Sequence, residues 1–178
     1  MSLLILTAIA LAFVFLVIFG ALSDLSTFRI PNWVSYWLVI LFVAQSIFLW
    51  GSTPDVLIFS VMVPAFVVNL AVGLVVFIVS LVFWGRGYIG GGDAKYLVAT
   101  SLWMGPVGVV EFMVLVSALS VVMALLLKVS ANWGFLIHEG RFPGFVRRLY
   151  AKFEDNKLPF GFPIGLAALI MMPQVFTA

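Results

Sequence analysis

Two aspartates in an otherwise apolar chain have the residue type and the surroundings for chemistry. Asp93 directly follows Gly90, Gly91 and Gly92 between two long apolar runs, and Asp24 comes just after the first apolar run. An ionisable group at a membrane boundary is costly, so it is by default a candidate functional residue when a partner can be named. The glycines leave Asp93 unshielded and let another chain approach the backbone closely. Asp24 and Asp93 are therefore the candidate pair.

Paired carboxylates suit acid–base chemistry on a peptide bond. One protonated carboxyl polarises the carbonyl group, and the other, ionised, takes a proton from water. Two unit charges about 4 Å apart repel by about 4 kcal/mol at an effective dielectric constant of about 20, so the pair holds one proton near neutrality and titrates as a unit. We assign the base to Asp93, at a helix N-terminus, and the proton to Asp24, after a helix C-terminus, because the helix dipole favours an anion only at the former.

Each of these charged residues also has a purely structural interpretation. Asp93 is suited to capping the N-terminus of the helix that follows it, and Asp24 to lying in water after a helix. Lys95, two residues after Asp93, is suited to anchoring its helix by reaching the inner surface of the membrane. The residue types alone leave these interpretations open.

The composition indicates an integral membrane protein. Hydrophobic residues form 65% of the 178 residues and charged residues 9%, and the mean hydropathy is +1.27; a soluble domain is roughly 45–50% apolar and about 25% charged. The apolar runs have the length of membrane helices and lack the alternation of barrel strands. No basic residue precedes the first run, so we expect a retained helix and not a cleaved signal. The chain contains no cysteine, which excludes disulfides and thiolate metal sites.

The apolar runs predict an all-α fold with six transmembrane helices. A single helix from Asp93 to Leu127 would be about 52 Å long, well beyond a hydrocarbon core of about 30 Å, and Gly105-Pro106 offers the break. The third run is longer than a bilayer requires, which predicts a tilt, a bend near Pro64 or an extension past the surface. The second helix begins at Ile30-Pro31-Asn32. The predicted helices cover residues 3–22, 33–50, part of 56–84, 93–104, 107–127 and 162–175.

The short fourth helix would place Asp93 below the membrane surface. About 12 residues span about 18 Å, so if Met104 reaches the outer edge of a core of about 30 Å, Asp93 lies about 12 Å inside the cytoplasmic edge. Irregular backbone at that depth must be buried in protein or line a wet cavity, so we expect a water-accessible pocket that opens to the cytoplasm. Local thinning of the bilayer would instead give a shallower site.

The charges support this topology independently. With six helices, all nine basic residues fall on one side, and only Asp55 and Glu111 lie on the other. Basic residues in short loops stay cytoplasmic, so both termini are expected outside. Merging the fourth and fifth helices would put six basic residues on the wrong side. The basic residues are Arg29, Arg86, Lys95, Lys128, Arg141, Arg147, Arg148, Lys152 and Lys157.

A basic amphipathic helix is predicted between the fifth and sixth transmembrane helices. Within residues 145–153, the apolar side chains at 145, 146, 149, 150 and 153 share one helical face, and Arg147, Arg148 and Lys152 take the other. Such a helix is suited to lying at the interface of an anionic inner leaflet. Docking of a partner protein is the alternative.

Three segments resemble the motifs of the prepilin peptidases, which are membrane aspartic proteases of the GxGD type. The segments are Asp24-x-x-x-x-Arg29-Ile30-Pro31-Asn32, Gly90-Gly91-Gly92-Asp93-Ala94-Lys95 and Pro159-Phe160-Gly161-Phe162-Pro163-Ile164. The resemblance covers essentially the whole chain and implies that Asp24 and Asp93 are the catalytic pair. The residues that it implies for substrate binding or for shaping the site are Gly90, Gly91, Gly92, Lys95, Arg29, Pro31, Asn32, Pro159, Phe160 and Gly161. Without it, Pro31-Asn32 and Pro159-Phe160-Gly161 are also interpretable as helix punctuation.

Departures from the larger family members narrow the expected activity. Those bifunctional members insert a cytoplasmic domain with a cysteine cluster between the first two helices, where this chain has only Ser23 to Asn32. The chain is more similar to the short peptidases of tight-adherence (Flp-type) pilus systems, so we expect a single peptidase domain, residues 1–178, without N-methyltransferase activity. Tyr96 stands where the family often has leucine, a departure that we expect to affect the chemistry little.

The resemblance implies an endopeptidase of the bacterial inner membrane. It would remove the leader from prepilin or pseudopilin substrates at the cytoplasmic face, usually after a glycine. We expect contact with anionic membrane lipids and no metal, cofactor or nucleic acid. The alternatives are a small proton-coupled transporter that uses the same aspartates, which would need a polar route across the outer half of the membrane, and a structural assembly subunit, which has no use for an exposed aspartate.

Overall fold

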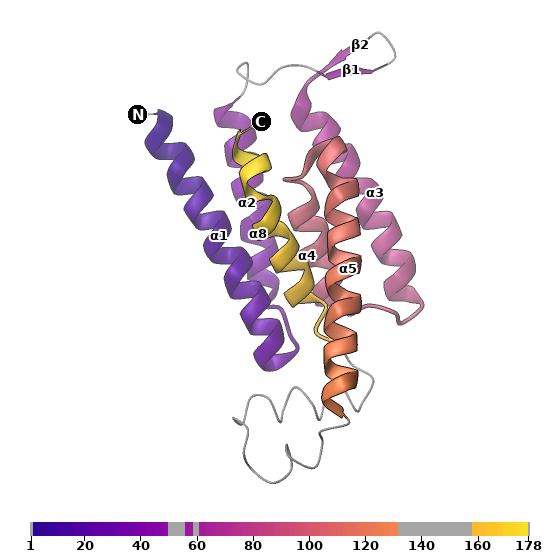
Figure 1. Cartoon of the computed structure of the whole chain (residues 1–178). Coiled ribbons are helices and arrows are strands. Elements are labelled where there is room, and N and C mark those ends of the chain that lie inside the picture. Colours follow the sequence, from indigo (N-terminus) through magenta and orange to yellow (C-terminus); the bar gives the residue numbers. More distant parts are fainter. Residues whose placement is uncertain (1, 50–55, 59–60, 132–157, 178) are drawn as a thin grey trace.

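The computed structural model describes residues 2–49, 56–58, 61–131 and 158–177 (Figure 1). Within these ranges the chain forms a bundle of six helices and one short β-hairpin. The helices are α1 (Ser2–Thr27), α2 (Asn32–Phe48), α3 (Ala65–Gly85), α4 (Gly91–Ser101), α5 (Gly105–Ala131) and α8 (Gly161–Thr177), and the strands are β1 (Val56–Ile58) and β2 (Val61–Val63). The predicted interfacial helix at 145–153 lies outside the described residues.

Three helices are long and apolar enough to cross a membrane. They are Leu4–Thr27 of α1, Ala65–Gly85 of α3 and Gly105–Val129 of α5, with 24, 21 and 25 residues. Two shorter apolar helices, α2 and α8, accompany them. The expectation of a helical membrane protein is thus confirmed at this level. The remaining helix, α4, has 11 residues, about 16 Å of helix.

The short helix α4 occupies the middle of the bundle. It packs against α2, α3, α5 and α8, while α1 packs against α2 and α8, and α5 against α3 and α8. In Figure 1, α1 and α3 lie at the two sides of the bundle with the other helices between them. The first residues of α1, the end of α8 and the β-hairpin lie at one end of the bundle, and the first residues of α4 lie toward the other (Figure 1).

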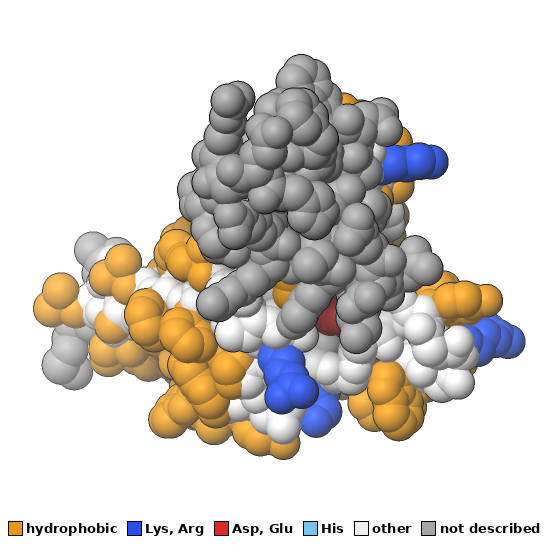
Figure 2. Space-filling model, turned by 90° about the horizontal axis from the view of Figure 1, so that it is seen from below, with side chains coloured by type: hydrophobic (Ala, Val, Ile, Leu, Met, Phe, Trp, Pro, Cys, Tyr) orange, Lys and Arg blue, Asp and Glu red, His pale blue; other side chains and the backbone are white. Residues whose placement is uncertain are grey.

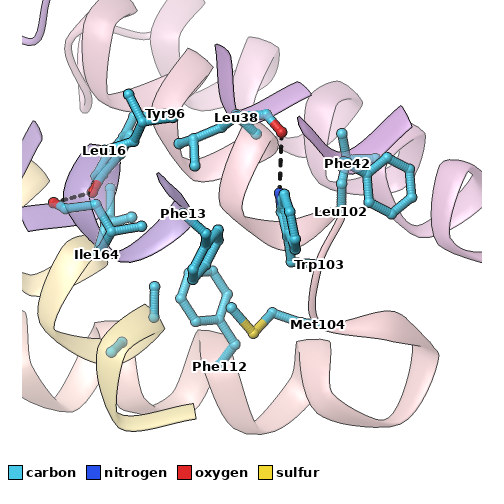
Figure 3. Packing of buried hydrophobic residues seen from close by; sticks show 14 of the residues in the cluster. Phe13, Leu16, Leu38, Phe42, Tyr96, Leu102, Trp103, Met104, Phe112 and Ile164 are labelled. Atoms are coloured by element: carbon cyan, nitrogen blue, oxygen red, sulfur yellow. Dashed lines mark hydrogen bonds between the residues drawn. The ribbon is translucent and has the colours of Figure 1, made fainter. Parts of the chain in front are cut away.

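The hydrophobic core is built around α4 from side chains of five helices. Phe13 of α1, Leu38 of α2 and Phe112 of α5 are completely buried together with Tyr96 of α4. Just after α4, the Trp103 ring lies 4.6 Å from the Phe13 ring, centroid to centroid, and its indole N–H donates to the Leu38 carbonyl at 3.2 Å (Figure 3). These contacts fix the far end of α4 against α1 and α2.

Helix α1 is longer than predicted, which changes the position of Asp24. The prediction ended the helix near Leu22 because the apolar run stops there. Polarity does not end the helix, however: α1 continues to Thr27, whose hydroxyl donates to the Ser23 carbonyl at 2.8 Å. Phe28 then takes a left-handed conformation with φ 54°, and its N–H donates to the Asp24 carbonyl at 2.8 Å, a common way to close a helix C-terminus. Asp24 therefore lies within α1 and not after it.

The helix expected within residues 56–84 is α3, and before it the chain has two short strands that the all-α prediction did not include. Val56–Ile58 and Val61–Val63 pair as antiparallel strands, with Val56 opposite Val63, and Pro64 is the N-cap of α3. A residue before proline is pushed away from the α region, and β-branched residues favour strands. Pro64 therefore precedes the helix, which begins at Ala65, where a bend was expected.

The other boundaries differ by a few residues. Helix α4 begins at Gly91 and ends at Ser101, where Asp93 to Met104 was expected, and α5 begins at Gly105. The predicted break before the fifth helix is confirmed, because Gly105 has φ 66°, a conformation that glycine adopts without strain. The last helix, α8, was expected at residues 162–175 and covers Gly161–Thr177, with Pro173 inside it.

Candidate active site

Asp24 is buried in the last turns of α1 and receives a backbone hydrogen bond from α8. Only 3% of the residue is exposed, and the Gly161 N–H donates to its Oδ2 at 2.7 Å. Gly161 is the first residue of α8, and the N–H groups of a first helical turn have no partner within the helix. A β-carbon on Gly161 would lie 2.9 Å from both Cβ and Oδ2 of Asp24. Glycine is thus required for this close approach.

Asp93 lies in the first turn of α4 and is half-buried. The N-cap of α4 is Gly90, so the interpretation of Asp93 as the N-cap is wrong. Its carboxylate accepts a hydrogen bond from the Gly90 N–H, the contact that an acidic residue at the third helical position makes back to the cap. A β-carbon on Gly90 would lie 2.8 Å from Asp93 Oδ2. The Asp93 carboxylate therefore lies against the backbone of Gly90, in the space that a side chain at position 90 would need.

The two carboxylates lie close enough for their charges to interact. Ile30 packs between the first turns of α8 and α4: a β-carbon on Gly161 would lie 2.5 Å from its Cδ1, and one on Gly92 would lie 3.5 Å from its carbonyl oxygen. Residues from all three motif segments therefore meet around Asp24, Ile30 and Asp93. Asp24 and the first turns of α4 and α8 come together although they are far apart in the sequence.

The helix dipoles act differently on the two aspartates. Asp93 lies at the N-terminus of α4, the positive end of a helix. Asp24 lies in the last turn of α1, the negative end of that helix, and also accepts a hydrogen bond at the positive N-terminus of α8. The dipole of α1 disfavours the anion on Asp24, and that of α8 opposes this effect, so the assignment of the proton to Asp24 stays a prediction.

The remaining residues of the first two motifs join α4 to the start of α2. The Lys95 ammonium donates to the Asn32 side-chain oxygen at 3.2 Å, and both residues are exposed. Pro31 is the N-cap of α2 and not a residue of its first turn as expected; its carbonyl accepts the Val34 N–H at 3.0 Å. Arg29 is exposed, and its carbonyl accepts the Ser23 hydroxyl at 2.9 Å. The bond between Lys95 and Asn32 thus joins the first turns of α4 and α2 at the surface.

The third motif approaches Asp24 through its backbone. Pro159 is completely buried and Phe160 is half-buried. The Phe160 carbonyl accepts the Ile164 N–H at 3.2 Å, which begins the hydrogen bonding of α8. Pro159-Phe160-Gly161 can therefore mark the beginning of α8 and also place Gly161 beside Asp24.

Two residues near the pair were not predicted from the sequence. The Trp84 indole nitrogen lies 3.3 Å from where a β-carbon on Gly91 would be, so this side chain covers the beginning of α4. Tyr96 is completely buried one turn after Asp93, and its hydroxyl donates to the Val17 carbonyl at 2.8 Å. The signal that could have indicated the role of Tyr96 is the small residues on two other helices that make room for its ring. A pattern within one segment of the sequence does not reveal them.

The arrangement defines a class of protein: a helical membrane protein with a glycine-lined carboxylate pair. Among the described residues, no group of three or more His, Cys, Asp or Glu side chains is placed to hold a metal ion. Residues 10–127, well over half of the chain, match the type IV leader peptidase family. The chain belongs to this family of proteases. The match includes Asp24 and Asp93, and the third motif lies beyond its end.

Comparison with curated proteins and with solved structures gives no significant match. The family assignment confirms the resemblance found in the sequence, and it does not support the transporter alternative.

Proposed function

We propose that the protein is a membrane aspartic endopeptidase that removes the leader from prepilin or pseudopilin substrates at the cytoplasmic face of the bacterial inner membrane. The observation that carries the proposal is the convergence of the three motif segments around Asp24, Ile30 and Asp93, with the two carboxylates close enough for their charges to interact. Membership of the leader peptidase family supports a prepilin-type substrate. No cofactor is needed for this reaction.

The chemistry follows from the pair. The protonated carboxyl donates to the oxygen of the scissile peptide carbonyl, and the ionised one takes a proton from a water molecule, which attacks the carbonyl carbon. In the tetrahedral intermediate the C–N bond breaks as the leaving nitrogen receives a proton from the pair. Gly90 is exposed beside the Asp93 carboxylate, and a residue without a side chain lets an extended substrate strand approach the backbone there.

We propose that all six helices cross the membrane and that both termini face outward. The described part of the chain contains four Lys and Arg residues, and all of them lie near helix ends at the end of the bundle where α4 begins. They are Arg29, Arg86, Lys95 and Lys128. Figure 2 views the bundle from this end and shows blue basic side chains on it. An excess of basic residues marks the cytoplasmic side.

Exposed aromatic side chains support a shallow site. Trp33, Tyr36 and Trp37 lie at the beginning of α2, and Trp84 and Tyr88 at or just after the end of α3, all exposed and all toward the end of the bundle where α4 begins. Aromatic residues concentrate at the membrane–water interface. Such a belt favours a carboxylate pair near the headgroups, or a locally thinned bilayer, over a pair about 12 Å inside the core.

The short connection between α1 and α2 supports a peptidase without methyltransferase activity. Helices α1 and α2 are joined by residues 28–31 alone, which leaves no room for an inserted domain. We propose that residues 1–178 form one multi-pass peptidase domain of the tight-adherence type, in contact with anionic lipids through its basic end.

The test is leader cleavage by the purified protein in lipid vesicles with a prepilin substrate. Asp24→Asn and Asp93→Asn are expected to abolish detectable cleavage while helix content and melting temperature stay near those of the wild type, because an amide cannot replace either carboxyl in proton transfer. Glu111→Gln is the matched control, since this exposed carboxylate lies on α5 near the opposite end of the bundle. Retained cleavage by either aspartate variant would refute the proposal.

A further inference from the structure

Tyr96 links the helix that carries Asp93 to the helix that carries Asp24. It is the largest completely buried side chain in the described part of the protein, and its hydroxyl donates to the Val17 carbonyl of α1 at 2.8 Å (Figure 3). Tyr96 is three positions after Asp93, so both lie on one side of α4. Val17 and Asp24 are two turns apart on α1, about 10 Å along the axis.

Two glycines on different helices form the space that holds the ring. A β-carbon on Gly20 of α1 would lie 3.0 Å from Cε2 and Cζ of Tyr96, and one on Gly165 of α8 would lie 3.0 Å from its hydroxyl oxygen. Gly20 is one turn from Asp24, and Gly165 is one turn from Gly161, the residue bonded to Asp24. The phenol therefore lies between the two helices that together fix the Asp24 carboxylate.

Resting on the proposed function, we propose that Tyr96 is a positioning residue that sets the separation of the Asp24 and Asp93 carboxylates through its hydrogen bond to Val17. The Asp24 carboxylate interacts electrostatically with the Tyr96 hydroxyl, so the hydrogen bond from Tyr96 to Val17 lies close to the carboxylate pair. A leucine at this position would fill part of the same space without the hydroxyl. This proposal replaces the expectation that Tyr96 affects the chemistry little.

Trp103 provides a matched control for this role. It also is a buried aromatic residue, just after the end of α4, and its N–H donates to a backbone carbonyl, that of Leu38 on α2, at 3.2 Å. Ten residues separate it from Asp93, which places it about 15 Å away along the chain direction of α4. Loss of this bond is expected to lower the stability of the bundle. It should not change the separation of the two carboxylates, which Tyr96 still sets.

The experiment compares Tyr96→Phe with Trp103→Phe in the full chain in lipid vesicles. Tyr96→Phe keeps the ring and removes the hydroxyl, and it is expected to lower kcat about tenfold with KM changed less than about twofold, because misplaced reacting groups lose rate and not substrate binding. Trp103→Phe is expected to lower the melting temperature and to leave kcat within about twofold of the wild type. Gly20→Ala keeps the hydroxyl but displaces the ring, and it is expected to reproduce the kcat loss.

A second readout needs no substrate. Infrared titration of the two carboxyl groups measures the separation between their protonation steps, which reports how strongly the pair interacts. This separation is expected to shrink in Tyr96→Phe and to stay unchanged in Trp103→Phe. Wild-type kcat and an unchanged separation in Tyr96→Phe, or equal losses of kcat in the two variants, would overturn the inference. Failure of the wild type to cleave any prepilin would refute the proposed function, and the titration would still decide the role of Tyr96.

Discussion

Replacing Gly161 by alanine tests whether the first turn of α8 holds the Asp24 carboxylate. The added methyl group would lie 2.9 Å from Cβ and Oδ2 of Asp24 and 2.5 Å from Cδ1 of Ile30. Ordinary contacts between such atoms are about 3.5–4.0 Å, so the carboxylate, Ile30 or α8 must move by about 0.5–1 Å. The hydrogen bond of 2.7 Å from the Gly161 N–H to Asp24 then lengthens or breaks.

The expected loss can be estimated from two effects. Overpacking a filled site costs about 1–3 kcal/mol of stability. A misplacement of about 1 Å in catalytic geometry costs on the order of 100-fold in rate, which corresponds to about 2.7 kcal/mol in the activation barrier. We therefore expect Gly161→Ala to lower kcat by about 100-fold and to reduce the melting temperature moderately.

The assay is leader cleavage in lipid vesicles together with a melting curve for each variant. Gly85→Ala is the matched control, because a β-carbon on Gly85, at the end of α3, would meet nothing within 4 Å. It is expected to retain both cleavage and stability, since alanine is the better helix former. If Gly161→Ala cleaves at the wild-type rate, or loses activity only as far as it unfolds, the argument that α8 positions Asp24 is wrong.

Two further substitutions probe the surroundings of the pair. Lys95→Met removes the exposed hydrogen bond to Asn32 and keeps the apolar stem; because exposed polar contacts contribute little, cleavage is expected to fall by no more than about threefold, and a loss of about 100-fold would mean that the ammonium acts on substrate or on the carboxylates. Gly105→Ala places a side chain at φ 66° before α5, so thermal unfolding is expected to show a loss of about 1–2 kcal/mol while the folded enzyme keeps its kcat; unchanged stability would contradict the role given to this glycine.

The sequence predicted the candidate pair and the helical membrane class for physical reasons that are local. Composition and apolar run length depend only on residue type, and an aspartate after three glycines stands out in such a chain. Boundaries were less well predicted, because hydropathy reports polarity and not backbone hydrogen bonding. Helix α1 therefore continues to Thr27, past the polar residues after Leu22, and the strands before Pro64 were missed.

The contacts that organise the site could not be predicted from spacing. The hydrogen bond between Gly161 and Asp24 joins residues 137 positions apart, and the space for Tyr96 is formed by glycines on α1 and α8. A glycine in a membrane helix has many possible uses, and only the packed structure shows which side chain fills the space that it leaves. The substitution of tyrosine for the family's frequent leucine was visible in the sequence, but its hydrogen-bond partner on α1 was not.

The assignment of roles to the two carboxylates now rests on their exposure and not on helix dipoles. Each aspartate accepts a glycine N–H at the start of a helix, Asp93 from Gly90 and Asp24 from Gly161. Asp24 also lies in the last turn of α1, where the helix dipole disfavours an anion, so the dipoles acting on Asp24 oppose each other. The two aspartates differ in access: Asp24 is buried, while Asp93 is half-buried beside the exposed Gly90. Water reaches Asp93 more readily, and a general base must contact the water that it activates. We therefore retain Asp93 as the proposed base, because the glycines that cap its helix also leave it open to solvent.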